Sequence, residues 1–347
     1  MKKLFGIILV FLLVFNLIGC KNASKETIYI FNFGDYISED VLKQFEKEYN
    51  CIVNQDLFEA NEEAQPILER NTAGYDLVCL SEYMIERLKG KDIFEEIDKS
   101  KISNYTNLDP EILKIMEIFD SNNTYAVPYF RGDIGICYNK SGLEKLGLPI
   151  PTEWADLWDP AYKGEIIMSS SIRDLFTAGA YKNNISSNTC NEEEIIKVFD
   201  DFIAQKPLVQ GYFSDQAKEK ILSGEALISL MLSGDMQYIY ENGDGDYYYL
   251  IPNGPKNVFV DSWCMLKNSK NKELAYKFLN FLLRDDIIRK NCEYVGYESV
   301  YTNVSDNDYL EVKIRNKYID NSTSVELERD LTPEAIKMYN REYNRIF

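Results

Sequence analysis

Strand-like and helix-like patterns of apolar residues alternate along the chain from residue 27 onward. Residues 27–33 (TIYIFNF) are rich in β-branched and aromatic side chains and predict a strand. Ser38 then offers an N-cap, followed by acidic residues and by apolar residues at helical spacing up to Tyr49. The next predicted elements are a strand over 51–58, a helix over 61–70 and a strand over 75–80. This alternation with short loops predicts a parallel sheet with right-handed crossovers.

A change of pattern near residue 125 indicates a second lobe. Residues 125–139 (YAVPYFRGDIGICYN) form two apolar extended pieces around Pro128 and Gly132, and predict a strand that crosses between lobes. Further helices are expected over 174–181, 192–203, 214–222 and 273–283, and further buried strands over 226–232 and 257–265. At 347 residues the chain is too long for one compact core and long enough for two lobes.

Acidic and aromatic residues occur together at three places where we expect strands to end. These are Phe33, Asp35 and Tyr36; Phe259 and Asp261; and Asp235 after a predicted strand. A carboxylate beside an aromatic face can hold an ammonium group through a charge-assisted hydrogen bond and cation–π attraction. Taken singly, each pair is more typical of a turn aspartate beside a core aromatic, and only convergence in one cleft indicates a site. Because the carboxyl ends of parallel strands share one rim, we expect residues 33–36 and 81–83 to lie together.

The first twenty residues predict an export signal. Two lysines precede an almost wholly apolar run, Leu4 to Leu17, and a glycine directly precedes Cys20. The run is shorter than the roughly 20 apolar residues that a membrane span needs. We interpret 1–19 as a lipoprotein signal peptide, Cys20 as the lipidated residue and 20–26 as a tether, so that the protein is anchored to a membrane and acts outside the cytoplasm. A cleaved signal with an incidental cysteine is the alternative.

Composition narrows the chemistry that we expect. The chain has 38 basic and 56 acidic residues, a net charge of −18, which repels phosphate and argues against nucleic acid as a partner. It has no histidine, which excludes Ser-His-Asp and Cys-His catalysis and histidine zinc sites. None of the seven cysteines has C-x-x-C spacing, so we expect no metal and no cofactor. Cys79, Cys137 and Cys264 lie in apolar runs and are expected to be buried thiols.

Several motifs occur in a fixed order over nearly all of the chain after Cys20. The most distinctive is 153–158 (EWADLW) followed by 162–164 (YKG), with two tryptophans at a fixed offset. The others are 32–36 (NFGDY), 75–78 (YDLV), 98–101 (DKSK), 107–110 (NLDP), 127–129 (VPY), 270–275 (KNKELA) and 281–284 (FLLR). In this order and spacing, the chain resembles the spermidine- and putrescine-binding proteins of ABC transporters.

The resemblance implies an α/β, type II periplasmic-binding-protein-like fold. In such a fold each of two lobes is a mainly parallel sheet flanked by helices, and the ligand is clamped in the interlobe cleft by hinge closure. We place lobe 1 at 27–130 plus 258–302, and lobe 2 at 131–257 plus 303–347. The implied function is a monomeric solute-binding protein, not an enzyme. It would capture a polyamine outside the cytoplasmic membrane and deliver it to the permease and ATPase of an ABC importer.

The resemblance also carries the family's ligand contacts to individual residues. The aromatic contacts, which flank the polyamine chain or wall the pocket, are Phe33, Tyr36, Phe259 and Tyr297. The acidic contacts, which meet its nitrogens or lie beside the aromatics, are Asp35, Asp174, Asp235 and Asp261. Ser81, Tyr83 and, in a looser alignment, Glu328 match further polar contacts.

Three departures from the family pattern affect the expected ligand. Phe33 stands where the family usually has tryptophan, and Leu232 replaces another common tryptophan. Ser171 stands where spermidine-preferring members carry aspartate. With one carboxylate fewer, we expect putrescine to bind at least as tightly as spermidine, unless Glu328 supplies the missing charge. Trp154 and Trp158 lie in a loop motif away from the rim and are expected to be structural.

Two other functions stay open at this point. A secreted enzyme such as a glycosidase or polysaccharide lyase could use two carboxyl groups about 5–10 Å apart. Against it, the acids are accompanied by aromatics and hydroxyls, and we expect no lysine or arginine at the rim. A surface adhesin or structural lipoprotein could keep this fold without a ligand, because fold alone does not fix function.

Overall fold

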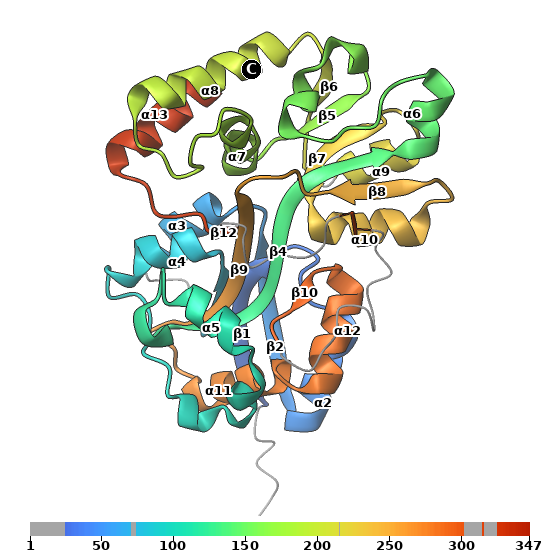
Figure 1. The fold of residues 1–347 in the computed structure, drawn as a ribbon. Helices are drawn as coiled ribbons and strands as arrows, with labels where there is room; N and C mark the ends of the chain where they lie inside the picture. Colours follow the sequence, from blue (N-terminus) through green and yellow to red (C-terminus); the bar gives the residue numbers. More distant parts are fainter. Residues whose placement is uncertain (1–24, 71–73, 215, 302–313, 316–324) are drawn as a thin grey trace, which may run out of the picture.

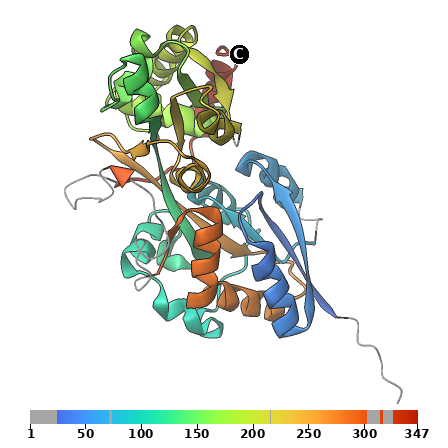
Figure 2. The same ribbon diagram turned by 90° about the vertical axis from the view of Figure 1, so that its right-hand side faces the viewer.

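Two long strands join the two lobes of the molecule (Figure 1). The structure is a computed structural model that describes residues 25–70, 74–214, 216–301, 314–315 and 325–347. Strand β4 (Ala126–Asn139) pairs with β9 (Lys256–Met265) over its first half, and with β7 (Ile228–Leu232) and β8 (Tyr247–Leu250) over its second half. Because β4 belongs to both sheets, its backbone connects the lobes directly. Figure 2 shows the lobes one above the other from the side.

The first lobe is built around the hydrophobic cluster formed mainly by residues 28–130 and 260–301. Its sheet has the order β2-β1-β3-β9-β4, in which β1 is parallel to β2 and β3, whereas β9 is antiparallel to β3 and β4. The strands besides β4 and β9 are β1 (Glu26–Phe33), β2 (Cys51–Phe58), β3 (Leu77–Leu80) and β10 (Glu298–Ser299). The helices are α2 (Glu39–Tyr49), α3 (Asn61–Arg70), α4 (Glu82–Lys89), α5 (Pro110–Met116), α11 (Lys272–Leu282) and α12 (Asp285–Val295).

The second lobe is built around two clusters that draw on residues 134–251 and 331–346. Strand β5 (Ile166–Ser169) is parallel to β6 (Val209–Phe213) and to β7, whereas β4 is antiparallel to β7 and β8. The helices are α6 (Lys140–Leu146), α7 (Ile172–Lys182), α8 (Glu192–Gln205), α9 (Gln216–Leu222), α10 (Ser233–Asn242) and α13 (Pro333–Tyr343). Short 3₁₀ helices occur at Lys99–Lys101, Ser103–Asn107, Ser121–Asn123, Trp154–Trp158 and Pro160–Tyr162.

A third segment that connects the lobes, residues 325–331, runs beside the crossing strand β9. The two-residue strand β12 (Val325–Glu326) pairs in parallel with β9, and β11 (Ile314–Arg315) pairs in parallel with β8. After β12, Leu327 packs into the first-lobe cluster and Leu331 into a second-lobe cluster. The chain therefore touches both cores within five residues. The lobe boundaries at 130/131, 257/258 and 302/303 stay a prediction.

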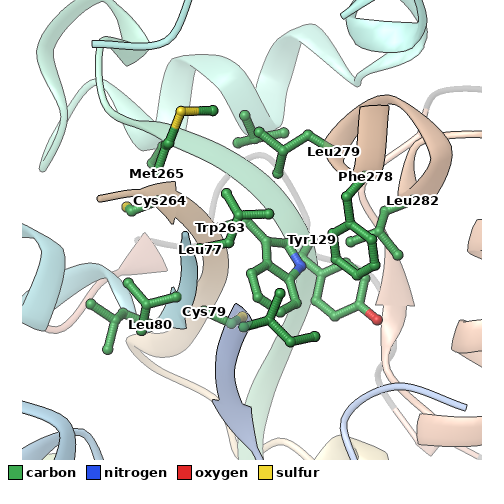
Figure 3. Close-up of a cluster of buried hydrophobic side chains, with 14 of the residues drawn as sticks. Leu77, Cys79, Leu80, Tyr129, Trp263, Cys264, Met265, Phe278, Leu279 and Leu282 are labelled. Carbon is green, nitrogen blue, oxygen red and sulfur yellow. The ribbon is translucent and has the colours of Figure 1, made fainter. Parts of the chain in front are cut away.

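Trp263 of β9 lies at the centre of the first-lobe core (Figure 3). It is 1% exposed, and its ring centroid lies 5.6 Å from that of Tyr129 and 5.9 Å from that of Phe278. Cys79 and Cys264 are buried in the same cluster, which confirms the sequence prediction for both, and burial raises their thiol pKa values. This packing anchors the C-terminal half of β9 in the first-lobe core.

Local sequence signals located the early elements well, and the predicted strand 51–58 and helix 61–70 coincide with β2 and α3. The two extended pieces around Pro128 and Gly132 are one strand, β4, with a register shift between Pro128 and Phe130. The sheets are mixed, because the crossing strands run antiparallel to their neighbours. The helices not predicted from sequence are α4, α5, α6, α10, α12 and α13.

Candidate ligand-binding site

Asp261 is the most deeply buried carboxylate among the candidate site residues. It lies inside β9 opposite Phe130 of β4, and it is 5% exposed. Its Oδ2 accepts a hydrogen bond from the hydroxyl of Tyr36, whereas Oδ1 is buried with no hydrogen-bond partner in the part of the chain that the structure describes. Burial raises the pKa of Asp261 to about 6, although the nearby hydroxyls of Tyr36 and Ser81 oppose the shift. A buried carboxylate oxygen without a partner is the kind of group that a cationic ligand satisfies.

Four aromatic rings form a continuous chain beside Asp261. The ring of Tyr36 lies 5.2 Å from that of Phe33 and 5.7 Å from that of Tyr297, in edge-to-face arrangements. Tyr297 in turn meets Phe259 at 5.3 Å with the ring planes perpendicular. These are the four aromatics that the family resemblance assigned to the ligand, and the fold brings them together. Their faces can contact methylene groups, and their π electrons attract ammonium groups.

Phe259 and Asp261 lie inside a strand, and our expectation that they follow a strand end was wrong. Both residues belong to β9, which runs on to Met265. Side chains two apart on a strand point to the same side, so Phe259 and Asp261 share one face of β9. Residues in the middle of the crossing strand β9 therefore supply site side chains, a role that residues after strand ends have in a simple parallel sheet.

Ser81 and Tyr83 lie where β3 passes into α4. Ser81 is the N-cap residue of α4, and its hydroxyl accepts a hydrogen bond from Asn61 at 3.0 Å. The hydroxyl of Tyr83, which is 7% exposed, donates to Glu62 at 3.0 Å. Both side chains are thus oriented by α3, the preceding helix. Ser81 also lies close enough to Asp261 to lower the pKa of that carboxyl, so Ser81 and Tyr36, which donates to Asp261, share this neighbour on β9.

The second lobe contributes two acids at helix N-termini. Asp174 lies in the first turn of α7, where its Oδ2 accepts from Ser169 at 3.2 Å and its N–H donates to Ser171 at 3.4 Å. Burial, with a smaller contribution from the nearby charges of Glu328 and Asp235, raises the pKa of Asp174 to about 7. Asp235 lies in the first turn of α10, and its Oδ1 is 3.0 Å from the ammonium of Lys218.

The carboxylate of Glu328 forms an ion pair with Arg173. Its Oε2 accepts from Nε of Arg173 at 3.1 Å, and the two side chains are only 9% and 10% exposed. The guanidinium of Arg173 also donates to Asn188 at 3.0 Å and lies 5.7 Å from the ring centre of Tyr83. Arg173 thus links α7 of the second lobe, the third segment and α4 of the first lobe. The expectation that no lysine or arginine accompanies the rim was wrong, since Arg173 and Lys218 both do.

Glu82 is a further buried acid that sequence reasoning missed. It is 1% exposed, and its two oxygens accept from the backbone N–H groups of Val260 on β9 and Glu328 on the third segment, both at 3.2 Å. Burial and the neighbouring charges of Glu328 and Asp261 raise its pKa well above the usual range. Glu82 therefore ties two interlobe connections to α4. Its place directly after the predicted rim serine was the only signal in the sequence.

Two predicted residues are not placed in this group. Asp35 is exposed in a left-handed turn conformation (φ 51°), which aspartate tolerates better than most residues. The structure thus gives Asp35 a turn role, and its ligand contact stays a prediction. Cys20, the signal peptide 1–19 and most of the tether lie outside the described residues.

The sequence was then compared with known proteins. The profile of the bacterial extracellular solute-binding proteins matches residues 72–321. The chain belongs to this family. The spermidine/putrescine-binding periplasmic protein of Salmonella typhimurium is 32% identical over 276 residues, which are 79% of this chain and 78% of that protein. The putrescine-binding periplasmic protein PotF of Escherichia coli is 29% identical over 296 residues, 81% of this chain and 79% of that one.

A solved structure agrees with the assignment of this chain to the solute-binding family. The spermidine/putrescine ABC transporter substrate-binding protein PotD of Streptococcus pneumoniae superposes with a TM-score of 0.76 at 26% identity, covering 93% of this chain and 98% of that chain. The expected type II periplasmic-binding-protein-like fold is therefore confirmed. Within the described ranges, the structure contains no helix that is long and apolar enough to cross a membrane. Those same ranges contain no cluster of three or more acidic or cysteine side chains suited to a metal ion.

Proposed function

We propose that this solute-binding protein captures polyamines outside the cytoplasmic membrane and delivers them to an ABC importer. The observation that carries the proposal is Asp261, whose Oδ1 is buried without a partner in the described part of the chain. No lysine or arginine of that part forms an ion pair with Asp261. An ammonium group placed there would make a charge-assisted hydrogen bond and remove the free-energy penalty of the buried oxygen.

The surroundings of Asp261 fit the rest of a polyamine. Tyr36, Phe259 and Tyr297 present rings to methylene groups, and Asp174 offers a second carboxylate from the opposite lobe. Contacts from both lobes would favour the closed arrangement when the ligand is bound. The names of the relatives, which bind putrescine or spermidine, support the same ligand class.

A ligand panel tests the proposal against its two alternatives. The soluble chain beginning at Lys21 is titrated calorimetrically with putrescine, spermidine, amino acids and oligosaccharides, and we expect heat of binding from polyamines alone. Binding of an oligosaccharide with turnover would contradict the proposal and favour a carbohydrate-active enzyme. Stability unchanged by every ligand in a parallel thermal-shift assay would favour an adhesin or structural lipoprotein.

Within this proposal we expect putrescine to bind at least as tightly as spermidine. Ser171, where spermidine-preferring relatives carry aspartate, is the N-cap of α7 and accepts from the N–H of Asp174. Aspartate is an equally good N-cap, so Ser171→Asp adds a charge without removing the cap. The expectation fails if spermidine binds the wild type more than about tenfold tighter, a gap of 1.4 kcal/mol, or if Ser171→Asp does not favour spermidine.

We also propose that the protein is a monomer held to a membrane by lipid on Cys20. Acylation needs the thiol, so Cys20→Ser should abolish palmitate labelling and leave the leader uncleaved by the lipoprotein signal peptidase. Retained label in the variant would place the anchor elsewhere.

A further inference from the structure

Lys218 of α9 already supplies a positive charge to Asp235. Its ammonium lies 3.0 Å from Oδ1 of Asp235 and 5.4 Å from the ring centre of Tyr238. The two side chains are 21% and 26% exposed, so solvent screens this pair only in part. A carboxylate with an aromatic ring beside it is the arrangement expected for a ligand ammonium, and here a lysine of the chain itself fills it.

Asp235 belongs to the same site as the other candidate acids. Burial is the main cause of the raised pKa of Asp174, and the charge of Asp235 adds to it, which is consistent with the two carboxylates lying near each other. The residue before it, Gly234, packs directly on Tyr297, because a Cβ added there would come within 2.5 Å of the tyrosine ring. The first turn of α10 therefore abuts the aromatic chain, and Lys218 reaches that turn from outside.

We propose that Lys218 is a specificity-determining residue that takes the place of one ligand ammonium group. The inference rests on the proposed polyamine function and names the ligand more closely. Of the acids brought together here, Glu328 is neutralised by Arg173 and Asp235 by Lys218. Glu82 is occupied on both oxygens by backbone N–H groups. Asp261 and Asp174 are left for the ligand, and the described residues place no lysine or arginine in an ion pair with either. Two available carboxylates match the two charges of a diamine, whereas a triamine would bring a third ammonium group toward the charge of Lys218.

Lys218→Gln tests this against a matched control. The control is Lys220→Gln on the same helix, since Lys220 pairs with Glu225 at 2.6 Å and lies 4.9 Å from the ring centre of Phe213. Calorimetry of putrescine and spermidine gives the ratio of their dissociation constants for each protein. We expect Lys218→Gln to shift that ratio toward spermidine by about tenfold, and Lys220→Gln to leave it unchanged. The double variant Lys218→Gln/Asp235→Asn should return the ratio to the wild-type value. It also removes the Asp235 carboxylate, which Lys218→Gln alone leaves without its lysine.

The possible outcomes distinguish the role of Lys218 from the proposed polyamine function. Wild-type binding of polyamines with a ratio that Lys218→Gln does not move would overturn the role of Lys218 and leave the proposed function intact. Failure of both proteins to bind any polyamine would overturn the proposed function and this inference with it. If thermal unfolding shows that Lys218→Gln does not fold, the ratio is measured instead in Lys218→Met, which keeps the aliphatic stem over Tyr238.

Discussion

The two lobes present their carboxylates to the candidate site in opposite ways. On the first-lobe side, Asp261 is buried among aromatic rings, with one oxygen held by Tyr36 and the other without a partner in the described residues. On the second-lobe side, Asp235 lies in the first turn of a helix and is paired with Lys218. The same residue type therefore has two roles: Asp261 needs a cation from outside, and Asp235 already has one from the chain.

This difference shows why the number of acids in a site does not give the charge of its ligand. Counting acids from the sequence gives five candidate contacts, including the exposed Asp35 and the loosely aligned Glu328. In the structure, Lys218 and Arg173 pair with Asp235 and Glu328, and Asp35 lies exposed in a turn, so Asp261 and Asp174 are the two predicted acids that remain at the site without a protein cation among the described residues. What a ligand meets is the charge that remains after internal pairing.

Replacing Asp261 should have the largest effect. Asp261→Asn removes the charge that lacks a partner, and we expect polyamine binding to weaken by about 2–4 kcal/mol, the range for breaking a buried charge pair. Asp156→Asn is the control, because Asp156 only caps a 3₁₀ helix by accepting from Thr152 and Glu153. Equal losses in the two variants by calorimetry would show that Asp261 is not a ligand contact.

Removing the hydroxyl that orients Asp261 should have the next largest effect. Tyr36→Phe deletes a hydrogen bond to a charged group, and we expect a loss of about 1.5–3 kcal/mol in binding at neutral pH. Tyr75→Phe is a matched control, because the hydroxyl of Tyr75 donates to Asp56 at 2.6 Å at an exposed position. An equal loss of binding in Tyr75→Phe and Tyr36→Phe would show that the Tyr36 hydroxyl does not act on binding through Asp261.

Acidification should weaken binding through the same carboxylate. The pKa of Asp261 in the ligand-free protein is raised to about 6 and that of Asp174 to about 7, above the usual value near 3.9. Between pH 4 and 7 the folded protein therefore holds more protons than the unfolded chain, so its stability without ligand rises as pH falls through this window. A polyamine needs the ionised forms, so we expect affinity to fall at least about tenfold from pH 7.5 to pH 5, the loss that the protonation of Asp261 alone would cause.

Thermal unfolding with and without putrescine at several pH values measures both trends at once. The stabilisation by putrescine should shrink as the pH falls, while the melting temperature of the free protein rises or holds. In Asp261→Asn the remaining pH dependence should centre near 7, where Asp174 titrates. A putrescine effect that is constant from pH 5 to 7.5 would contradict the assignment of either carboxylate.

Trimming an aromatic ring should have the smallest effect. Phe259→Leu removes one π face and leaves an apolar side chain, so we expect a loss of about 0.5–1 kcal/mol in binding with little change in stability. Phe199→Leu, in the second-lobe core, should lower stability with little change in binding, because Phe199 is fully buried and packs on Phe176 and Tyr339. If the two variants behave alike in both assays, Phe259 acts through packing and not through the ligand.

Local patterns in the sequence were sufficient for the elements that form from short-range interactions. β1, β2 and α3 were located nearly residue for residue, because alternation and helical spacing reflect which face of an element is buried. The motif order indicated the family, and the aromatic chain of Tyr36, Phe259 and Tyr297 followed from it. The short helix α4 was missed, since its eight residues directly follow a buried strand.

Only the tertiary structure decided which charges meet. Tyr36 and Asp261 are 225 positions apart, and Arg173 and Glu328 are 155 apart, so no local pattern relates them. Lys218 and Asp235 are closer in sequence, yet the strand β7 lies between them and the turn of α10 sets their contact. The sequence by itself determined the fold class and the kinds of side chain at the site, because these depend on periodicity and motif order. It did not determine which carboxylates keep their charge for a ligand, because ion pairing depends on distances between side chains that arise only when the chain has folded.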